Sequence, residues 1–139
     1  MTDLTLTCRR TINASPERVY NAWLDPAMMT RFMAPGGDMH ISEARSDARA
    51  GGRFFVLMVG EKPMPHEGRY ITLTPFSRLV FTWEAPWSAP DTQVEIQLTP
   101  VGAGTEIVLT QVKFMSGQSR DGHKQGWDAI LTKLAEVLG

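Results

Sequence analysis

The sequence predicts an α+β fold in which a curved antiparallel sheet of seven strands wraps around one long C-terminal helix. Three observations indicate this architecture. Residues 117–139 carry apolar side chains at helical spacing, two short helix signals follow a first strand segment, and six further strand-like segments are separated by short turns. Because an isolated helix of this length is only marginally stable in water, its apolar side must be buried against the sheet.

The first strand and the two short helices occupy the first quarter of the chain. Residues 4–12 alternate apolar and polar side chains, which is the period of a half-buried strand. Ser15-Pro16 supplies a good N-cap and a suitable first helical residue, and Asp25-Pro26 ends this helix. A second helix is predicted over residues 27–32, with Pro35-Gly36-Gly37 as its stop signal.

The middle of the chain reads as six consecutive strands. Turn signals at residues 51–52, 61–63, 75–77, 89–91 and 102–104 divide it. The strands are predicted near residues 38–46, 52–59, 66–74, 78–85, 92–99 and 105–114. Loops this short favour an antiparallel meander with one apolar face.

The C-terminal segment is the longest amphipathic stretch in the sequence. Its apolar residues recur at spacings of three and four, at Trp127, Ile130, Leu131, Leu134 and Leu138. This pattern predicts a helix over residues 117–139 whose apolar stripe faces the concave side of the sheet.

Composition limits the classes of function. A chain of 139 residues with 42% hydrophobic and 21% charged residues is typical of one soluble domain over residues 1–139. The net charge of −1 gives no electrostatic reason to expect a nucleic acid or a membrane as partner. The single cysteine, Cys8, and the absence of an apolar leader favour the cytoplasm. Edge strands of the meander could pair in a homodimer.

An ordered set of short motifs runs over nearly the whole chain. It comprises Ile12-Asn13-Ala14-Ser15-Pro16-Glu17, Val19, Ala22-Trp23, Asp25-Pro26, Pro35-Gly36-Gly37, Asp47, Arg49, Gly51-Gly52, Gly68, Tyr70, Pro75, Arg78-Leu79-Val80-Phe81-Thr82-Trp83, Gly104-Thr105, Gly126-Trp127, Leu131 and Leu134. With the order β-α-α-β6-α, this set resembles the helix-grip fold of the SRPBCC (START-like) superfamily. Within that superfamily it is similar to the family named for the activator of heat-shock-protein-ninety ATPase. Phe32-Met33-Ala34 departs from the aromatic residues that this family often has there.

The resemblance implies a cavity between the long helix and the concave face of the sheet. The expected lining is Phe54, Val56, Met58, Tyr70, Phe81, Trp83, Val94, Ile96, Ile107, His123, Trp127, Ile130 and Leu134. Aromatic and methionine side chains of this kind suit a small apolar ligand. The alternative, given about equal weight, is that the same side chains fill the core.

Three functions are consistent with such a cavity. The first is the binding of a small hydrophobic or aromatic molecule. The second is an enzyme of the cyclase, dehydratase or hydrolase type, for which His123, Tyr70 and Glu84 are the candidate polar groups. For His123 and Glu84 the solvated position is the commoner alternative, and His66 is also expected to be exposed. The third, regulation of a chaperone ATPase, is suggested only by the name of the family.

Motifs for cofactors and metals do not occur in the sequence. There is no phosphate-binding loop, dinucleotide fingerprint, nucleophile elbow or zinc knuckle, and the three histidines have no metal-binding spacing. We therefore predict no cofactor and no metal, and we assign no catalytic residue. Asp47 and Arg49 are expected to form a local ion pair in a turn, and Cys8 is expected to be a small core residue.

Overall fold

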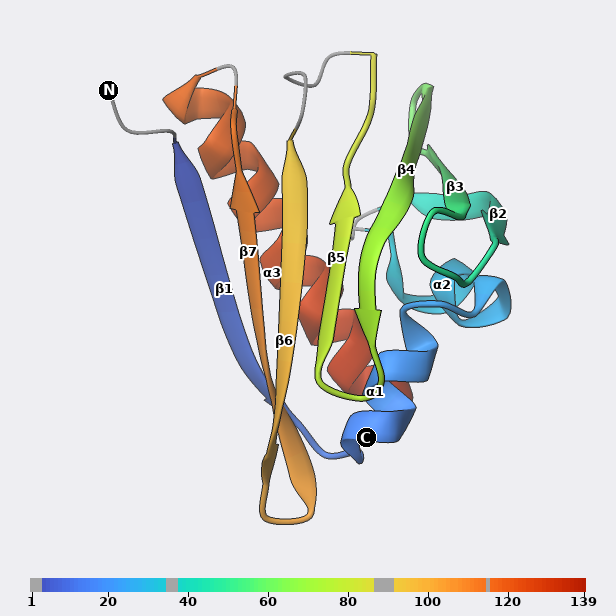
Figure 1. The fold of residues 1–139 in the computed structure, drawn as a ribbon. Helices are drawn as coiled ribbons and strands as arrows, with labels where there is room; N and C mark the ends of the chain where they lie inside the picture. The colour runs from blue at the N-terminus through green and yellow to red at the C-terminus, as the bar shows by residue number, and fades with distance from the viewer. Residues whose placement is uncertain (1–3, 35–37, 87–91, 115) are drawn as a thin grey trace.

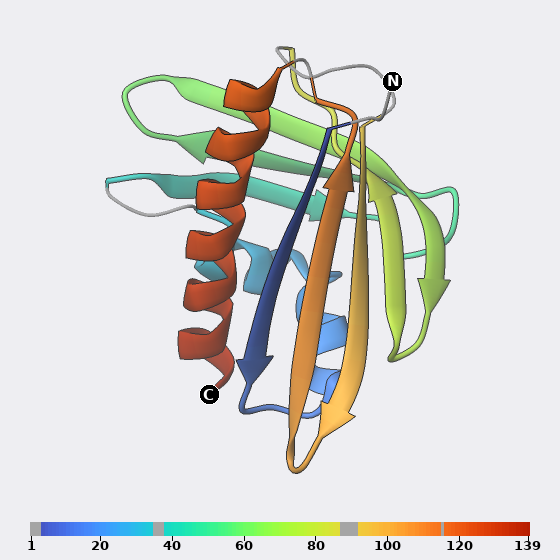
Figure 2. The ribbon, with the colours of Figure 1, turned by 90° about the vertical axis from the view of Figure 1, so that its left-hand side faces the viewer.

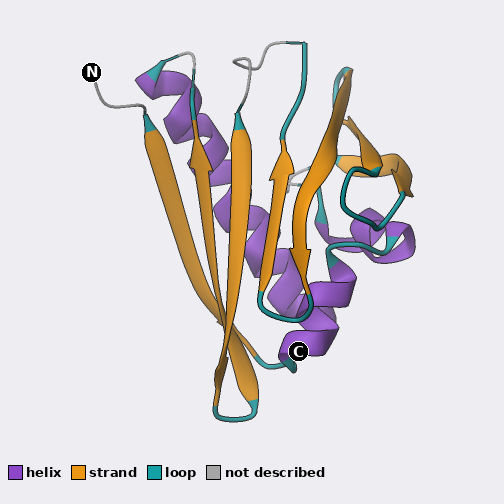
Figure 3. Ribbon diagram, viewed as in Figure 1, coloured by secondary structure: helices purple, strands orange, loops and turns teal. Residues whose placement is uncertain are grey.

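The computed structural model describes residues 4–34, 38–86, 92–114 and 116–139 (Figure 1). In chain order the elements are β1 (Thr5–Ile12), α1 (Pro16–Ala22), α2 (Pro26–Phe32), β2 (His40–Ser46), β3 (Arg53–Val59), β4 (Pro63–Thr74), β5 (Arg78–Thr82), β6 (Gln93–Val101), β7 (Gly104–Val112) and α3 (Gly117–Leu138). The predicted α+β class and the predicted order of elements are confirmed (Figure 3). The predicted helix stop at 35–37 and the predicted break at 89–91 lie outside the described residues.

The strands form one antiparallel sheet in the order β1-β7-β6-β5-β4-β3-β2. The register between β4 and β5 shifts between Tyr70 and Thr72, and irregularities of this kind bend a strand. Figure 2 shows the bend. Strands β2, β3 and the first part of β4 run across the direction of β1, β7 and β6, and the second part of β4 turns to run beside β5. The sheet therefore curves around α3, as the sequence predicts.

The two short helices begin at side-chain caps. The Ser15 hydroxyl accepts a hydrogen bond from the Arg18 amide at 3.2 Å, and the Asp25 carboxylate accepts one from the Ala27 amide at 2.9 Å. Each interaction satisfies an amide that has no partner within its helix. Asp25-Pro26, predicted as the end of the first helix, therefore also starts the second. Helix α2 packs against β2 and α3.

The core lies between the concave face of the sheet and the C-terminal half of α3. Trp127, Ile130, Leu131 and Leu134 are buried there, which confirms the predicted stripe. In contrast, none of residues 117–126 is buried. The two halves of α3 therefore meet the sheet differently, and space for a site is left beside the N-terminal half.

Strands β4 and β5 depart furthest from their predicted limits, whereas the other strands agree within two residues at each end. Strand β4 begins at Pro63 because residues 63–65 pair with the end of β3, where Pro63 lies opposite Val59. Strand β5 ends at Thr82 rather than at residue 85, and beyond it Glu84 forms only an isolated bridge with Glu67. None of the described helices combines the length and the apolar character needed to cross a membrane.

Candidate functional site

A pocket of about 310 Å³ lies between the N-terminal half of α3 and the inner side of β3 and β4. It is lined by Met58, His66, Trp83, Ser119, Gly122, His123, Gly126, Trp127 and Ile130. Four of these residues have large apolar or aromatic side chains, two are histidines, one is a serine and two are glycines. This composition is typical of a small-molecule site, in which apolar walls hold a few polar groups.

The helix side of the pocket is built from a serine, two glycines and a histidine at helical spacing. Ser119, Gly122, His123 and Gly126 lie at positions i, i+3, i+4 and i+7, so they share one face of α3. A Cβ atom added at Gly122 would meet no atom within 4 Å. This face lies N-terminal to the buried stripe of α3, and none of its residues is buried.

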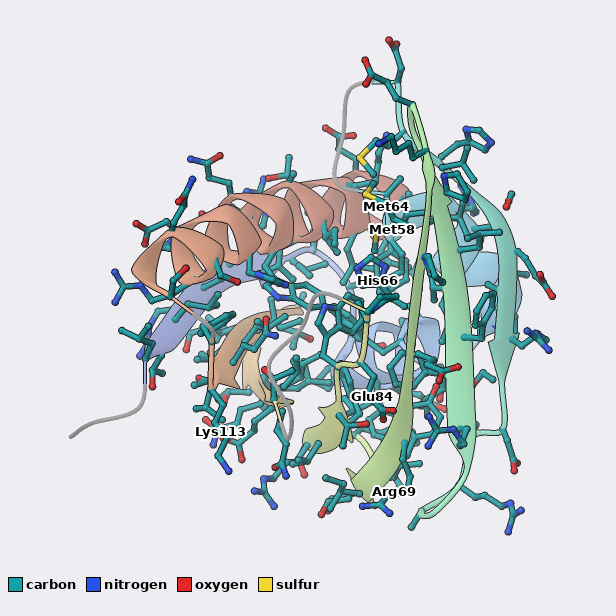
Figure 4. All side chains as sticks on the ribbon, turned by 90° about the horizontal axis from the view of Figure 1, so that it is seen from above. Met58, Met64, His66, Arg69, Glu84 and Lys113 are labelled. Atoms are coloured by element: carbon teal, nitrogen blue, oxygen red, sulfur yellow. The ribbon has the colours of Figure 1, made fainter. Side chains whose placement is uncertain are left out.

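The sheet side of the pocket is formed by inward-facing residues of β3 and β4. Figure 4 shows Met58, Met64 and His66 on the side of these strands that faces α3, with Glu84 farther from the helix. Trp83, which follows β5, contacts both sides of the pocket. Its ring centroid lies 4.8 Å from that of His66 and 4.8 Å from that of Trp127.

A buried chain of hydrogen bonds orients the indole of Trp127. Its Nε1 donates to Oε1 of Gln111 at 2.7 Å, and Nε2 of Gln111 donates to the Thr92 hydroxyl at 3.1 Å. The Thr92 hydroxyl in turn donates to the carbonyl of Val112 at 2.6 Å. Gln111 is not among the predicted site residues, although a polar residue on the same strand face as Ile107 and Leu109 was a readable signal.

The two pocket histidines have the same tautomer when they are neutral. Nδ1 of His66 lies 3.1 Å from the carbonyl of Met64, and Nδ1 of His123 lies 2.8 Å from the carbonyl of Ser119. A carbonyl oxygen only accepts, so Nδ1 carries the proton in both rings and Nε2 carries the lone pair. Burial lowers the pKa of His66 to about 4.

The prediction that His66 is exposed is wrong. Only 6% of this residue is exposed. The prediction placed it at the entrance of a strand that starts at residue 66. In the structure β4 starts at Pro63, so His66 is inside the strand and its position faces the core together with Gly68 and Tyr70.

The residues that the sequence predicts to line the cavity divide into three groups. Those that line the pocket are Met58, Trp83, His123, Trp127 and Ile130. Those that surround, with Trp83, a deeper void of only about 10 Å³ are Phe54, Val56, Tyr70 and Phe81. Those that are buried but line neither space are Val94, Ile96, Ile107 and Leu134. Aromatic packing therefore fills the deep part of the expected cavity, and the open volume lies beside the start of α3.

The three polar residues predicted as candidates for an enzyme, His123, Tyr70 and Glu84, lie in different environments. The Tyr70 hydroxyl lies 2.8 Å from the Ser46 hydroxyl, and burial raises the pKa of Tyr70 to about 12. Glu84 accepts a hydrogen bond from Arg53 at 3.1 Å on the exposed side of the sheet. Of the three candidates, only His123 lines the pocket.

Three further expectations concern other parts of the chain. The ion pair between Arg49 and Asp47 is present, with an N–O distance of 2.9 Å, and Cys8 is buried in the core. Both predictions are confirmed. Within the described residues, His, Cys, Asp and Glu side chains form no group of three or more that could hold a metal ion.

Comparison with known proteins decides the family. The sequence model of the family described as Activator of Hsp90 ATPase homolog 1-like protein matches residues 13–139. The chain belongs to this family. The resemblance noted in the sequence is thereby confirmed, together with the helix-grip fold.

Solved structures share this fold over nearly the whole chain. Protein CV1439 from Chromobacterium violaceum is 26% identical, with a TM-score of 0.86 and coverage of 96% of each chain. Mll3558 from Rhizobium loti is 27% identical, with a TM-score of 0.80 and coverage of 97% of this chain and 96% of that one. The AHSA1-like protein from Aeromonas hydrophila, 24% identical with a TM-score of 0.83, covers 96% and 90% and shows the same fold. A search of curated proteins found no significant match.

Proposed function

We propose that this protein binds a small, largely apolar molecule in the pocket beside the N-terminal half of α3. The observation that supports this proposal is the pocket itself, with a volume of about 310 Å³ and walls that include Met58, Trp83, Trp127 and Ile130. A cavity of roughly 150 Å³ accommodates benzene in a well-studied engineered protein. The pocket therefore has room for a molecule of about two rings.

The glycines of α3 favour the interpretation of the pocket as a binding site over its interpretation as a packing defect. In a helix interior each glycine is about 1 kcal/mol less favourable than alanine. Gly122 and Gly126 both lie on the pocket face, one turn apart. Larger apolar residues at these positions would extend the stripe of α3 and close the space, so the chain keeps the pocket open against its own helix propensity.

A thermal-shift experiment with a matched pair of variants tests the proposal. Apolar aromatic compounds of one to three rings are titrated against the unmodified protein and against Gly122→Leu, whose side chain extends into the pocket. Gln125→Leu adds the same side chain at an exposed position of the same helix that does not line the pocket. A compound present at 100 times its Kd should stabilise the protein by about 2.7 kcal/mol.

The expected result is a saturable rise in Tm for the unmodified protein and for Gln125→Leu, with little or none for Gly122→Leu. Equal shifts in all three proteins would place the binding elsewhere, and no shift with any compound would contradict the proposal. Native mass spectrometry of protein purified from its own host provides an independent test. A stoichiometric bound compound, identified after denaturing extraction, would name the ligand.

The enzymatic and chaperone alternatives stay predictions. An enzyme would need a polar group directed at its substrate, and His123 is the one sequence-based candidate that lines the pocket. The family description names an activator of a chaperone ATPase. A direct assay of ATPase stimulation by this chain would test that activity.

A further inference from the structure

The described lining of the pocket contains no permanently charged side chain that could pair with a charged ligand. Among the described residues that line it, none is Asp, Glu, Lys or Arg. His66 is buried, and its position on the inner face of β4 keeps its ring out of water. A carboxylate or an ammonium group would therefore lose its hydration without gaining an ionic partner, which is strongly unfavourable. An uncharged ligand fits this lining best.

The aromatic residues form an angled contact surface, in which neighbouring rings are tilted against one another. Trp83 and Trp127 lie with ring centroids 4.8 Å apart and an interplanar angle of 55°, and the ring of His66 lies 4.8 Å from Trp83. The indole of Trp127 is held in one orientation by its hydrogen bond to Gln111. Fixed aromatic rings of this kind pack well against the face or edge of a ligand ring.

The helix side of the pocket supplies a hydrogen-bond acceptor. Nδ1 of His123 carries the proton because it donates to the carbonyl of Ser119 at 2.8 Å. The neutral ring therefore accepts through Nε2. The ring is half-buried, packs against Phe114 with a centroid distance of 5.3 Å, and lines the pocket. A ligand with an O–H donor would complement this acceptor.

We propose that the ligand is an uncharged aromatic compound with a hydroxyl group, of the phenol or naphthol class. Its ring packs against Trp83 and Trp127, and its O–H donates to Nε2 of His123. This inference rests on the proposed function and adds the chemical class of the ligand. It assigns His123 as the residue that selects a donor over an apolar group of the same size.

Isothermal titration calorimetry with matched compounds tests the inference at pH 7.5. The compounds are 2-naphthol, 2-methylnaphthalene, in which a methyl group replaces the hydroxyl, and 2-naphthoate, which carries a charge. They are titrated against the unmodified protein, His123→Leu and His123→Gln, the last of which retains a side-chain acceptor. The measured quantity is the ratio of the affinities for 2-naphthol and 2-methylnaphthalene in each protein, so that packing effects of the substitution cancel.

We expect this ratio to fall roughly five- to tenfold in His123→Leu, the size of one net hydrogen bond, and to recover in part in His123→Gln. Circular dichroism checks that both variants fold. An unchanged ratio, with both neutral compounds still bound, overturns the assignment of the ligand class and leaves the proposed function intact. Tightest binding of 2-naphthoate also overturns it. No binding of any compound to the unmodified protein overturns the inference and the proposed function together.

Discussion

Replacing Gly122 by alanine should stabilise the protein, because the new methyl group enters the pocket instead of a packed core. A Cβ atom at this position would meet no atom within 4 Å, and the backbone of Gly122 does not have a positive φ. Alanine is about 1 kcal/mol more favourable than glycine in a helix interior. In a chain of this size, a gain of about 1 kcal/mol raises Tm by roughly 3–5 °C.

Differential scanning calorimetry measures this change, and Gly68→Ala is the matched contrast. A Cβ atom at Gly68 would lie 2.6 Å from the Phe54 ring and would also collide with the carbonyl of Thr82. That variant should lose about 1–3 kcal/mol of stability or more, as overpacked cores do. Replacement of glycine by alanine should therefore raise Tm at Gly122 and lower it at Gly68.

A fall in Tm for Gly122→Ala would refute the reasoning. It would mean that the space beside Gly122 is occupied in solution, either by the sheet side chains or by a movement of α3. The volume assigned to the pocket would then be lost, and the proposal of a ligand site would fail with it. A rise in Tm without any change on adding a ligand would leave the pocket in place and count only against binding.

Three further predictions concern buried polar groups. Gln111→Leu removes the acceptor for Nε1 of Trp127 and should destabilise the protein by about 1–3 kcal/mol, measured by urea unfolding. The pKa of His66 is about 4 in the folded state against an ordinary value of 6.5. Between pH 4 and pH 6.5, His66 is therefore protonated in the unfolded chain but not in the folded protein. The corresponding stability is complete above pH 6.5 and is lost as the pH falls through 4, by about 3 kcal/mol in total. His66→Phe should abolish this difference when unfolding curves of both proteins are compared across that pH range. Burial raises the pKa of Cys8 to about 12, so its thiol should react with an aromatic disulfide reagent at least tenfold more slowly in native protein than in urea; equal rates would contradict the assigned burial.

The errors in the predicted strands show where local patterns stop being informative. Pro63 was interpreted as a turn residue and Pro65 was left outside the strand predicted to begin near residue 66. Proline lacks the amide that a strand uses for pairing. In the structure both lie in β4, opposite Val59 and Leu57 of β3. Pairing between β3 and β4 depends on both segments, so the local pattern of one segment did not predict it. Because β4 begins at Pro63, His66 lies inside the strand and is buried, although it was expected at an exposed strand end.

The sequence by itself determined the order of elements and the faces that they bury. The spacing of Trp127, Ile130, Leu131 and Leu134 predicted the buried side of α3, and alternation predicted the inner side of the strands. These patterns are readable because the helix and the strand each have a fixed local period, which places side chains on known faces.

Only the tertiary structure decided which inward-facing residues fill the core and which line an open pocket. Phe54, Tyr70 and Phe81 pack against one another, whereas Gly122 and His123 face empty space. The hydrogen bond from Trp127 to Gln111 likewise joins α3 to β7. The physical reason is that periodicity is a property of one segment, but a volume depends on the distance between two surfaces. That distance is set by the curvature of the whole sheet around α3.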